Sequence, residues 1–122
     1  MKRPLTILIV GLVSLLAACG GAGPGANSSV RQIVMLEMSF APNRIDAHVG
    51  ETITIRLVNQ GGQKHDFLFP ALHMPGLEGK ESIVEPGATA TLSVRFDEPG
   101  VHRFICSLPG HAAMTGAVYV SP

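Results

Sequence analysis

The sequence is poor in aromatic residues, in cysteine and in net charge. It contains no Trp, one Tyr and two Cys in 122 residues, and nine basic residues balance nine acidic ones. Such a balance gives no electrostatic reason for binding a nucleic acid, so we expect no nucleic-acid partner. A chain of this length forms one domain of ordinary size.

Enzyme motifs are also missing from the sequence. The one Gly-rich run, residues 20–25, neither follows a predicted strand nor opens a helix, so it is not a phosphate-binding loop. Neither a Ser/His/acid set nor a pair of catalytic carboxylates stands out. We therefore expect that the protein is not an enzyme.

The apolar run near the N-terminus, residues 5–16, is shorter than the roughly 20 residues that a membrane-spanning helix needs. Lys2 and Arg3 precede it, and Leu16-Ala17-Ala18-Cys19 follows. This tetrad resembles the lipobox of bacterial lipoproteins, which implies a signal peptide over 1–18 and a lipidated Cys19. An ordinary secretory signal is the alternative. We expect an exported protein, held by its acyl chains at the periplasmic or cell-surface face of a bacterial membrane.

The remaining chain divides into a tether and a domain. Residues 19–29 have no apolar periodicity and predict a flexible, Gly-rich tether. Residues 30–122 alternate between apolar and polar with a period of two, which predicts strands with one buried face. The predicted strands cover 34–40, 45–49, 53–57, 65–69, 82–84, 88–96, 101–105 and 117–120. Seven or eight short strands with Gly/Pro turns indicate an all-β, antiparallel sandwich.

Three potential metal ligands of soft character lie within nine residues near the C-terminus. Cys106, His111 and Met114 offer a thiolate, an imidazole and a thioether, a mixture that favours copper. His65 is the fourth donor that a folded domain could bring to them. With Cys19 lipidated, Cys106 is a single thiol in an exported domain. It is either a ligand or a buried small hydrophobe.

The residues around these donors resemble a known family. Gly-Val-His-Arg-Phe-Ile-Cys, Pro-Gly-His and Met-Thr-Gly-Ala-Val-Tyr-Val are similar to segments of the cupredoxins, the blue copper proteins related to plastocyanin, azurin and sulfocyanin. The resemblance covers residues 30–122 and implies a Greek-key β-sandwich with one copper ion that alternates between Cu(I) and Cu(II). It implies a trigonal plane of His65, Cys106 and His111, an axial Met114, and an Asp66 that ties the ligand loops together.

One spacing departs from the family. Only two residues separate His111 from Met114, whereas azurin-like chains have three and plastocyanin-like chains four. A longer copper–sulfur contact, or a backbone carbonyl next to His65 as an extra donor, would remain compatible with the family.

The resemblance implies a single-electron carrier. Its expected partners are exported or membrane-associated redox proteins such as cytochromes or membrane oxidoreductases, and we expect a monomer. A copper chaperone or storage protein on the same fold is the main alternative. A metal-free adhesive or scaffolding sandwich is a second, and a fragment-like relative of an oxidase or copper reductase is a third.

Other His and Met residues have less specific interpretations. We expect His48 on the solvated surface and His102 in a packing or hydrogen-bonding role. His73 and Met74, in the long connection that follows Pro70, are a candidate for a second, weak copper site. Met35 and Met38 are expected on opposite faces of one strand.

Overall fold

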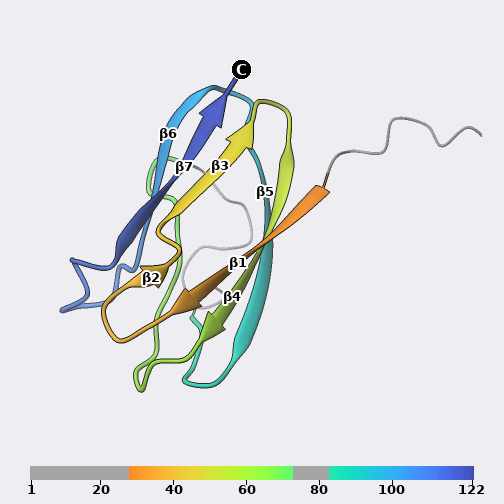
Figure 1. Ribbon diagram of the computed structural model, residues 1–122. Coiled ribbons are helices and arrows are strands. Elements are labelled where there is room, and N and C mark those ends of the chain that lie inside the picture. Colours follow the sequence, from red (N-terminus) through yellow and green to blue (C-terminus); the bar gives the residue numbers. More distant parts are fainter. Residues whose placement is uncertain (1–27, 73–82) are drawn as a thin grey trace, which may run out of the picture.

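The computed structural model describes residues 28–72 and 83–122, and they form a sandwich of two β-sheets (Figure 1). Within these residues there is no helix, and therefore none that could cross a membrane. The strands are β1 (Ser28–Met35), β2 (Phe40–Ala41), β3 (Arg44–His48), β4 (Thr52–Asn59), β5 (Thr89–Arg95), β6 (Gly100–Ile105) and β7 (Thr115–Ser121).

The two sheets are mixed rather than purely antiparallel. One has the order β2-β1-β4-β5 and the other β3-β7-β6. β1 pairs with β4, and β3 with β7, in parallel, while the other pairs are antiparallel. The all-β sandwich is confirmed, and the expectation of an antiparallel sandwich needs this correction. The physical reason lies in the connections. A tight hairpin forces two consecutive strands to run antiparallel. β1 and β4 are not consecutive in the sequence, and neither are β3 and β7, so the longer chain between them allows parallel pairing.

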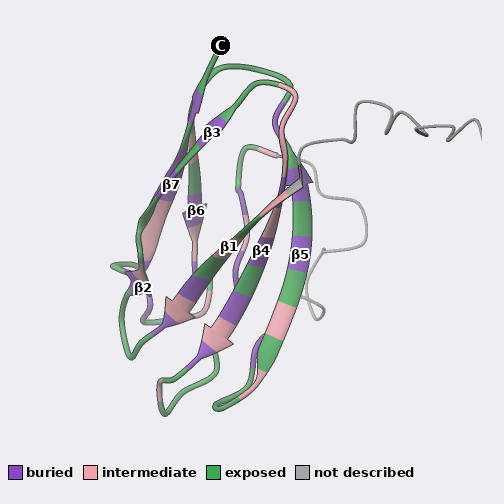
Figure 2. Cartoon of the chain, turned by 45° about the vertical axis from the view of Figure 1, so that its right-hand side comes forward, coloured by how far each residue is buried: buried purple, intermediate pink, exposed green. Residues whose placement is uncertain are grey.

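The core lies between the sheets and follows the predicted alternation. In β4 every second side chain is buried, and in β5 Leu92 and Val94 are buried while Ala90, on the same face, is half-buried (Figure 2). All five Phe residues of the chain are buried, and their rings pack mostly edge to face with centroids 4.8–5.9 Å apart. Edge-to-face rings add about 0.5–1.5 kcal/mol per pair beyond the area they bury. These rings are Phe40, Phe67, Phe69, Phe96 and Phe104.

The first predicted strand, 34–40, differs from the structure in its bounds and in the face that is buried. β1 ends at Met35, where the N–H of Leu36 donates to the Ser39 carbonyl at 2.9 Å and closes a turn. Ile33 and Met35 are therefore the buried residues, and Leu36 and Met38 are exposed. Met38 lies in this turn, so it does not share a strand with Met35. The strand also begins at Ser28, two residues before the predicted start of the domain.

The predicted strand at 65–69 is replaced by two isolated bridges. His65 bridges to Val84, and Leu68 bridges to Ile105 in β6. The segment changes its partner after three residues, which prevents a continuous ladder. Of the predicted strand at 82–84, the described residues 83 and 84 contribute only the bridge at Val84.

Several predictions fall outside the residues that the structure describes. These are the signal peptide at 1–18, Cys19 and most of the tether, and the pair His73 and Met74.

Candidate metal centre

The hairpin formed by β6 and β7 places Cys106 beside Met114. Ile105 pairs with Thr115 at the end of the ladder, and the Cys106 N–H then donates to the Met114 carbonyl at 3.0 Å. Cys106 and Met114 therefore face each other at the position that follows this pair in the β6–β7 hairpin. Directly opposite residues of an antiparallel pair have Cβ atoms about 4.5–5.5 Å apart. The approach of Met114 to Cys106 is therefore set by strand register, which the short His111–Met114 spacing does not disturb.

The loop between these strands is closed by two further backbone hydrogen bonds. The His111 N–H donates to the Leu108 carbonyl at 3.1 Å, and the Met114 N–H donates to the His111 carbonyl at 2.8 Å. Gly110 has a φ of +85°, a left-handed conformation that glycine adopts without strain. Together they turn the His111 ring back over the end of the sandwich.

His65 reaches the same place from segment 65–68, which bridges to Val84 and Ile105. Its N–H and carbonyl form both hydrogen bonds of the bridge to Val84, at 3.2 and 2.7 Å. The next side chain, Asp66, accepts a hydrogen bond from the Ser107 N–H at 2.6 Å and another from the Ser107 hydroxyl. Asp66 therefore connects the segment that carries His65 to the loop that begins at Cys106, as the family resemblance implied.

The three donors converge in the buried end of the sandwich. The Cys106 Sγ and the His65 Nδ1 each lie 3.3 Å from the His111 Nδ1, and the candidate ligand atoms all lie within 4.8 Å of one another. Metal bonds of about 2.0–2.3 Å hold donors roughly 3.3–3.9 Å apart. The three residues therefore fit one metal ion, and in the described part of the chain they are the one such group of His, Cys or carboxylate residues.

Burial disfavours the charged forms of two of the candidate ligands, His65 and Cys106. It lowers the pKa of the His65 imidazole, and the neighbouring His111 lowers it further. Burial also raises the pKa of the Cys106 thiol, although hydrogen bonds from the backbone N–H groups of Asp66 and Leu108 oppose this rise. A neutral imidazole has a free lone pair, and a bound metal displaces the thiol proton. The site is therefore poised to exchange protons for a metal ion.

Met114 completes a donor set of sulfur and nitrogen. Its side chain is fully buried next to Cys106 in the hairpin register. Zinc accepts Cys and His but takes its fourth bond from nitrogen, thiolate or oxygen, whereas a trigonal His₂Cys plane with a weak thioether is the arrangement of type 1 copper sites. The four residues are arranged like such a site.

Two residues that support the site were not identified in the sequence. The Gln63 Oε1 lies 3.3 Å from the His111 Nε2, on the side of the ring opposite the other donors. The buried Asn59 holds the loop of Gln63 through its side-chain amide. Segment 59–62 indicated only a turn, and the polar side chain two positions before His65 was the signal that could have identified Gln63.

Two other histidines of the described residues, His48 and His102, have the roles expected of them. His48 is exposed at the opposite end of the sandwich. The ring of His102 packs against Phe96 with centroids 4.9 Å apart, and its Nε2 lies 3.1 Å from the Glu98 carbonyl oxygen. Both predictions are confirmed.

A groove of about 760 Å³ runs beside the thiol end of the site. It lies between β6 and the ligand loop, and Arg103, Ile105, Cys106, Leu108 and Pro109 are among its lining residues. On the loop itself, Pro109, Ala112 and Ala113 are exposed and Leu108 is half-buried, so apolar side chains surround the position of His111.

Comparisons with known proteins agree with this architecture. The sequence model of the cupredoxin-like domain family matches residues 6–120. No curated protein matches the sequence significantly.

Among solved structures, auracyanin A, a "blue" copper protein from the green photosynthetic bacterium Chloroflexus aurantiacus, aligns with a TM-score of 0.66. The alignment has 19% identity and covers 77% of this chain and 99% of auracyanin A. Reduced auracyanin from Roseiflexus castenholzii has a TM-score of 0.64 and 21% identity over 80% of this chain and all of its own. A multicopper oxidase has a TM-score of 0.67 and 15% identity over 78% of this chain, which corresponds to 39% of the oxidase chain. At these identities the likeness establishes the fold.

Proposed function

Because the chain belongs to the cupredoxin-like domain family, we propose that it is a type 1 copper protein that carries single electrons between redox partners. The observation that carries this proposal is the convergence of Cys106, His65 and His111, whose ligand atoms lie within 4.8 Å of one another in a buried pocket. The three donors come from two separate segments, which backbone and side-chain hydrogen bonds hold together.

The residues have distinct roles in this proposal. His65 and His111 would hold copper through their Nδ1 atoms, Cys106 would hold it as a thiolate, and the Met114 thioether would be the weak fourth donor. Bound copper would supply a one-electron couple, Cu(II) plus one electron giving Cu(I), and a geometry intermediate between the preferences of the two states suits both. The residues themselves hold that geometry, so electron transfer requires little movement of the protein.

A carrier is favoured over an enzyme. The described residues offer one group of His and Cys ligands for a single metal, whereas the similar multicopper oxidase chain is more than twice as long as the part that aligns. The apolar surface of the ligand loop suits brief contacts with a redox protein, because transient redox complexes use small interfaces. Cytochromes or membrane oxidoreductases are the proposed partners.

We further propose that the protein works at a membrane surface outside the cytoplasm. The support is the lipobox-like tetrad that ends in Cys19, followed by a short Gly-rich segment before β1 begins at Ser28. Mass spectrometry of the protein purified from membranes should find acyl chains on Cys19. Recovery of Cys19→Ser in the membrane fraction at the wild-type level would contradict the anchor.

A copper titration tests the electron-carrier function. The purified protein should bind one Cu(II), develop intense visible absorption from thiolate-to-copper charge transfer, and cycle reversibly by one electron in voltammetry. A colourless Cu(I) complex that exchanges readily would instead indicate a chaperone or storage protein. Copper binding without any thiolate band would overturn the proposal.

A further inference from the structure

We propose that Gln63 is a positioning residue for His111, whose side-chain amide fixes the imidazole tautomer and biases the site toward Cu(II). The redox part of this inference rests on the proposed copper function. The tautomer part concerns the protein alone and holds without any metal.

The two nitrogens of the His111 ring face different surroundings. Nδ1 points inward, 3.3 Å from the Cys106 Sγ and 3.3 Å from the His65 Nδ1. Nε2 points to the other side, 3.3 Å from the Gln63 Oε1. A neutral imidazole carries its proton on one nitrogen only, and the hydrogen bond made there decides which. With the amide oxygen as acceptor, the proton stays on Nε2 and the lone pair of Nδ1 faces the ligand pocket.

Gln63 is itself held in place by a buried side chain. The Asn59 Nδ2 donates to the Gln63 carbonyl at 2.8 Å and to the Val84 carbonyl at 2.9 Å, and its Oδ1 accepts the Gly61 N–H at 2.9 Å. Asn59 is only 1% exposed. A buried amide with its donors and acceptor satisfied fixes the surrounding backbone firmly. The Gln63 side chain therefore starts from a rigid loop although it is exposed.

His65 is supported differently. Its Nε2 is buried and makes no hydrogen bond of good geometry, and the polar group beside the ring that favours a proton is the Leu36 backbone. The two imidazoles are thus inequivalent, because the acceptor beside His111 is a side chain that can be substituted.

An acceptor on the outer N–H makes a histidine a stronger donor to its metal. A stronger donor stabilises the more highly charged ion, so the Gln63 contact favours Cu(II) over Cu(I). A charged acceptor in place of the amide should strengthen this effect, and an apolar side chain should remove it. The reduction potential should therefore rise in the order Gln63→Glu, wild type, Gln63→Leu.

The test compares these two variants with a matched control in the full chain. Gln60 lies on the same loop, is exposed, and its side chain makes no polar contact with described residues, so Gln60→Leu changes the loop surface without touching His111. Nitrogen NMR of the metal-free protein should show the Nε2–H tautomer of His111 in wild type and Gln60→Leu. Gln63→Leu should show a mixture of tautomers. It should also bind Cu(II) about 10-fold more weakly, at the low end of losses seen when an outer partner of a ligand is removed.

The readouts separate this inference from the proposed function. Failure of the wild type to form a blue copper complex would overturn the carrier function, while the NMR comparison would still decide the tautomer. A blue wild type with identical tautomers, potentials and affinities in Gln63→Leu and Gln60→Leu would overturn the role of Gln63. The same potential in Gln63→Glu and Gln63→Leu would reject the hydrogen bond as the cause.

Discussion

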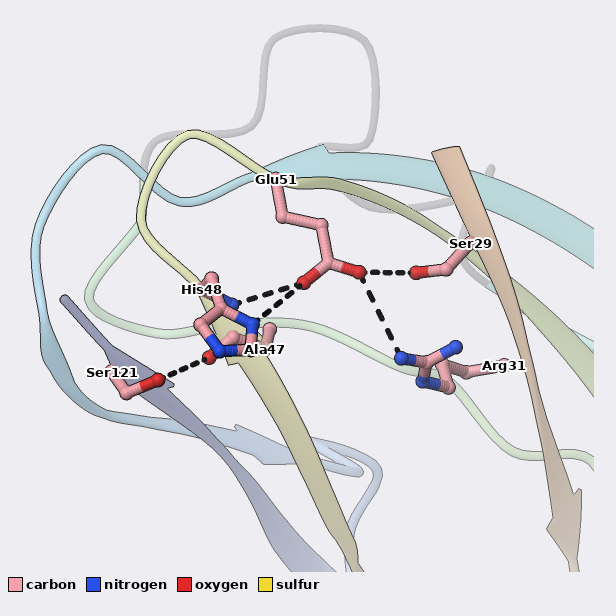
Figure 3. A network of polar contacts seen from close by, with 6 residues as sticks. All are labelled: Ser29, Arg31, Ala47, His48, Glu51 and Ser121. Atoms are coloured by element: carbon pink, nitrogen blue, oxygen red, sulfur yellow. Dashed lines mark hydrogen bonds and ion pairs between the residues drawn. The ribbon is translucent and has the colours of Figure 1, made fainter. Parts of the chain in front are cut away.

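Polar side chains have different surroundings at the two ends of the sandwich. At one end, β1 and β4 begin and β3 and β7 finish, and Glu51 lies at the centre of a network of polar contacts (Figure 3). Its carboxylate accepts hydrogen bonds from the Ser29 hydroxyl and, at 3.0 Å, from the His48 N–H. Arg31 lies 3.7 Å away and the His48 Nδ1 3.8 Å away. This network lies near the surface, and its partners favour the charged carboxylate, whose pKa is lowered.

At the other end the polar groups are buried and their charged forms are disfavoured. The pKa of His65 is lowered and that of the Cys106 thiol is raised, in both cases chiefly by burial. The Nε2 of His65 is buried without a hydrogen bond of good geometry. One end of the sandwich therefore holds a network of mutually satisfied polar groups, and the other holds the buried donors of the proposed metal site.

Removal of the thiol should produce the largest change at the ligand end. Cys106→Ser should lose the visible copper band and the stabilisation that bound metal confers. For the wild type at a thousandfold excess over the dissociation constant, this stabilisation is about 4 kcal/mol. Visible spectra and denaturant unfolding, each with and without Cu(II), measure both losses. Intense absorption in Cys106→Ser would show that another group is the sulfur ligand.

A methyl group at Gly116 should disturb the packing of the β6–β7 hairpin. A Cβ there would lie 2.3 Å from the Phe104 ring and 2.5 Å from the Asn43 carbonyl oxygen, so Gly116→Ala requires the core to move. Overpacking of this kind costs about 1–3 kcal/mol. Gly62→Ala is the matched control, because its Cβ would meet only the end of the Glu37 side chain. Equal unfolding free energies for the two variants would contradict the close packing at Gly116.

The axial position can be tested without disturbing the fold. Met114→Leu conserves volume at a fully buried site, so its cost in stability should be less than about 1.5 kcal/mol. Loss of the thioether should leave copper bound but raise the reduction potential, because a weaker axial donor stabilises Cu(II) less. Voltammetry of the copper-loaded variant provides the measurement. An unchanged potential would mean that Met114 is not the axial ligand.

The strands with strict alternation were predictable, and those near loops were not. β4 and β5 alternate over their whole length because one face of each packs on the core. The buried face of β1 was predicted wrongly because Val34, Leu36 and Met38 alternate with polar residues as a buried face would. The turn at 36–39 leaves Leu36 and Met38 exposed at about 40%. Period two alone does not reveal where a strand stops.

The cluster of candidate ligands could be predicted because its chemistry is rare, whereas the residues that support it could not. A thiol, an imidazole and a thioether in nine residues point to a soft metal before any geometry is known. Gln63 and Asn59 have common side chains, and their roles depend on a loop conformation that brings them to His111. The change of partner within segment 65–68, from Val84 to Ile105, depends likewise on tertiary pairing.

The smallest effect is expected at the end of the sandwich that holds Glu51. There, Glu51→Gln removes a charge that the polar contacts of Glu51 stabilise. The folded pKa of Glu51 is lowered, first by the Ser29 hydroxyl and then by the His48 N–H, so its stabilisation is present above the unfolded pKa near 4.5 and is lost as pH falls through the folded value. Loss of the charge-assisted bonds should cost about 1 kcal/mol near neutral pH. The deficit should vanish in acid, where the wild-type carboxyl is protonated too. Denaturant unfolding across pH measures this dependence, and Asp46→Asn, which breaks only the exposed pair with Arg44, should change little at any pH. A deficit for Glu51→Gln that is constant with pH would mean that packing, rather than charge, holds this end together.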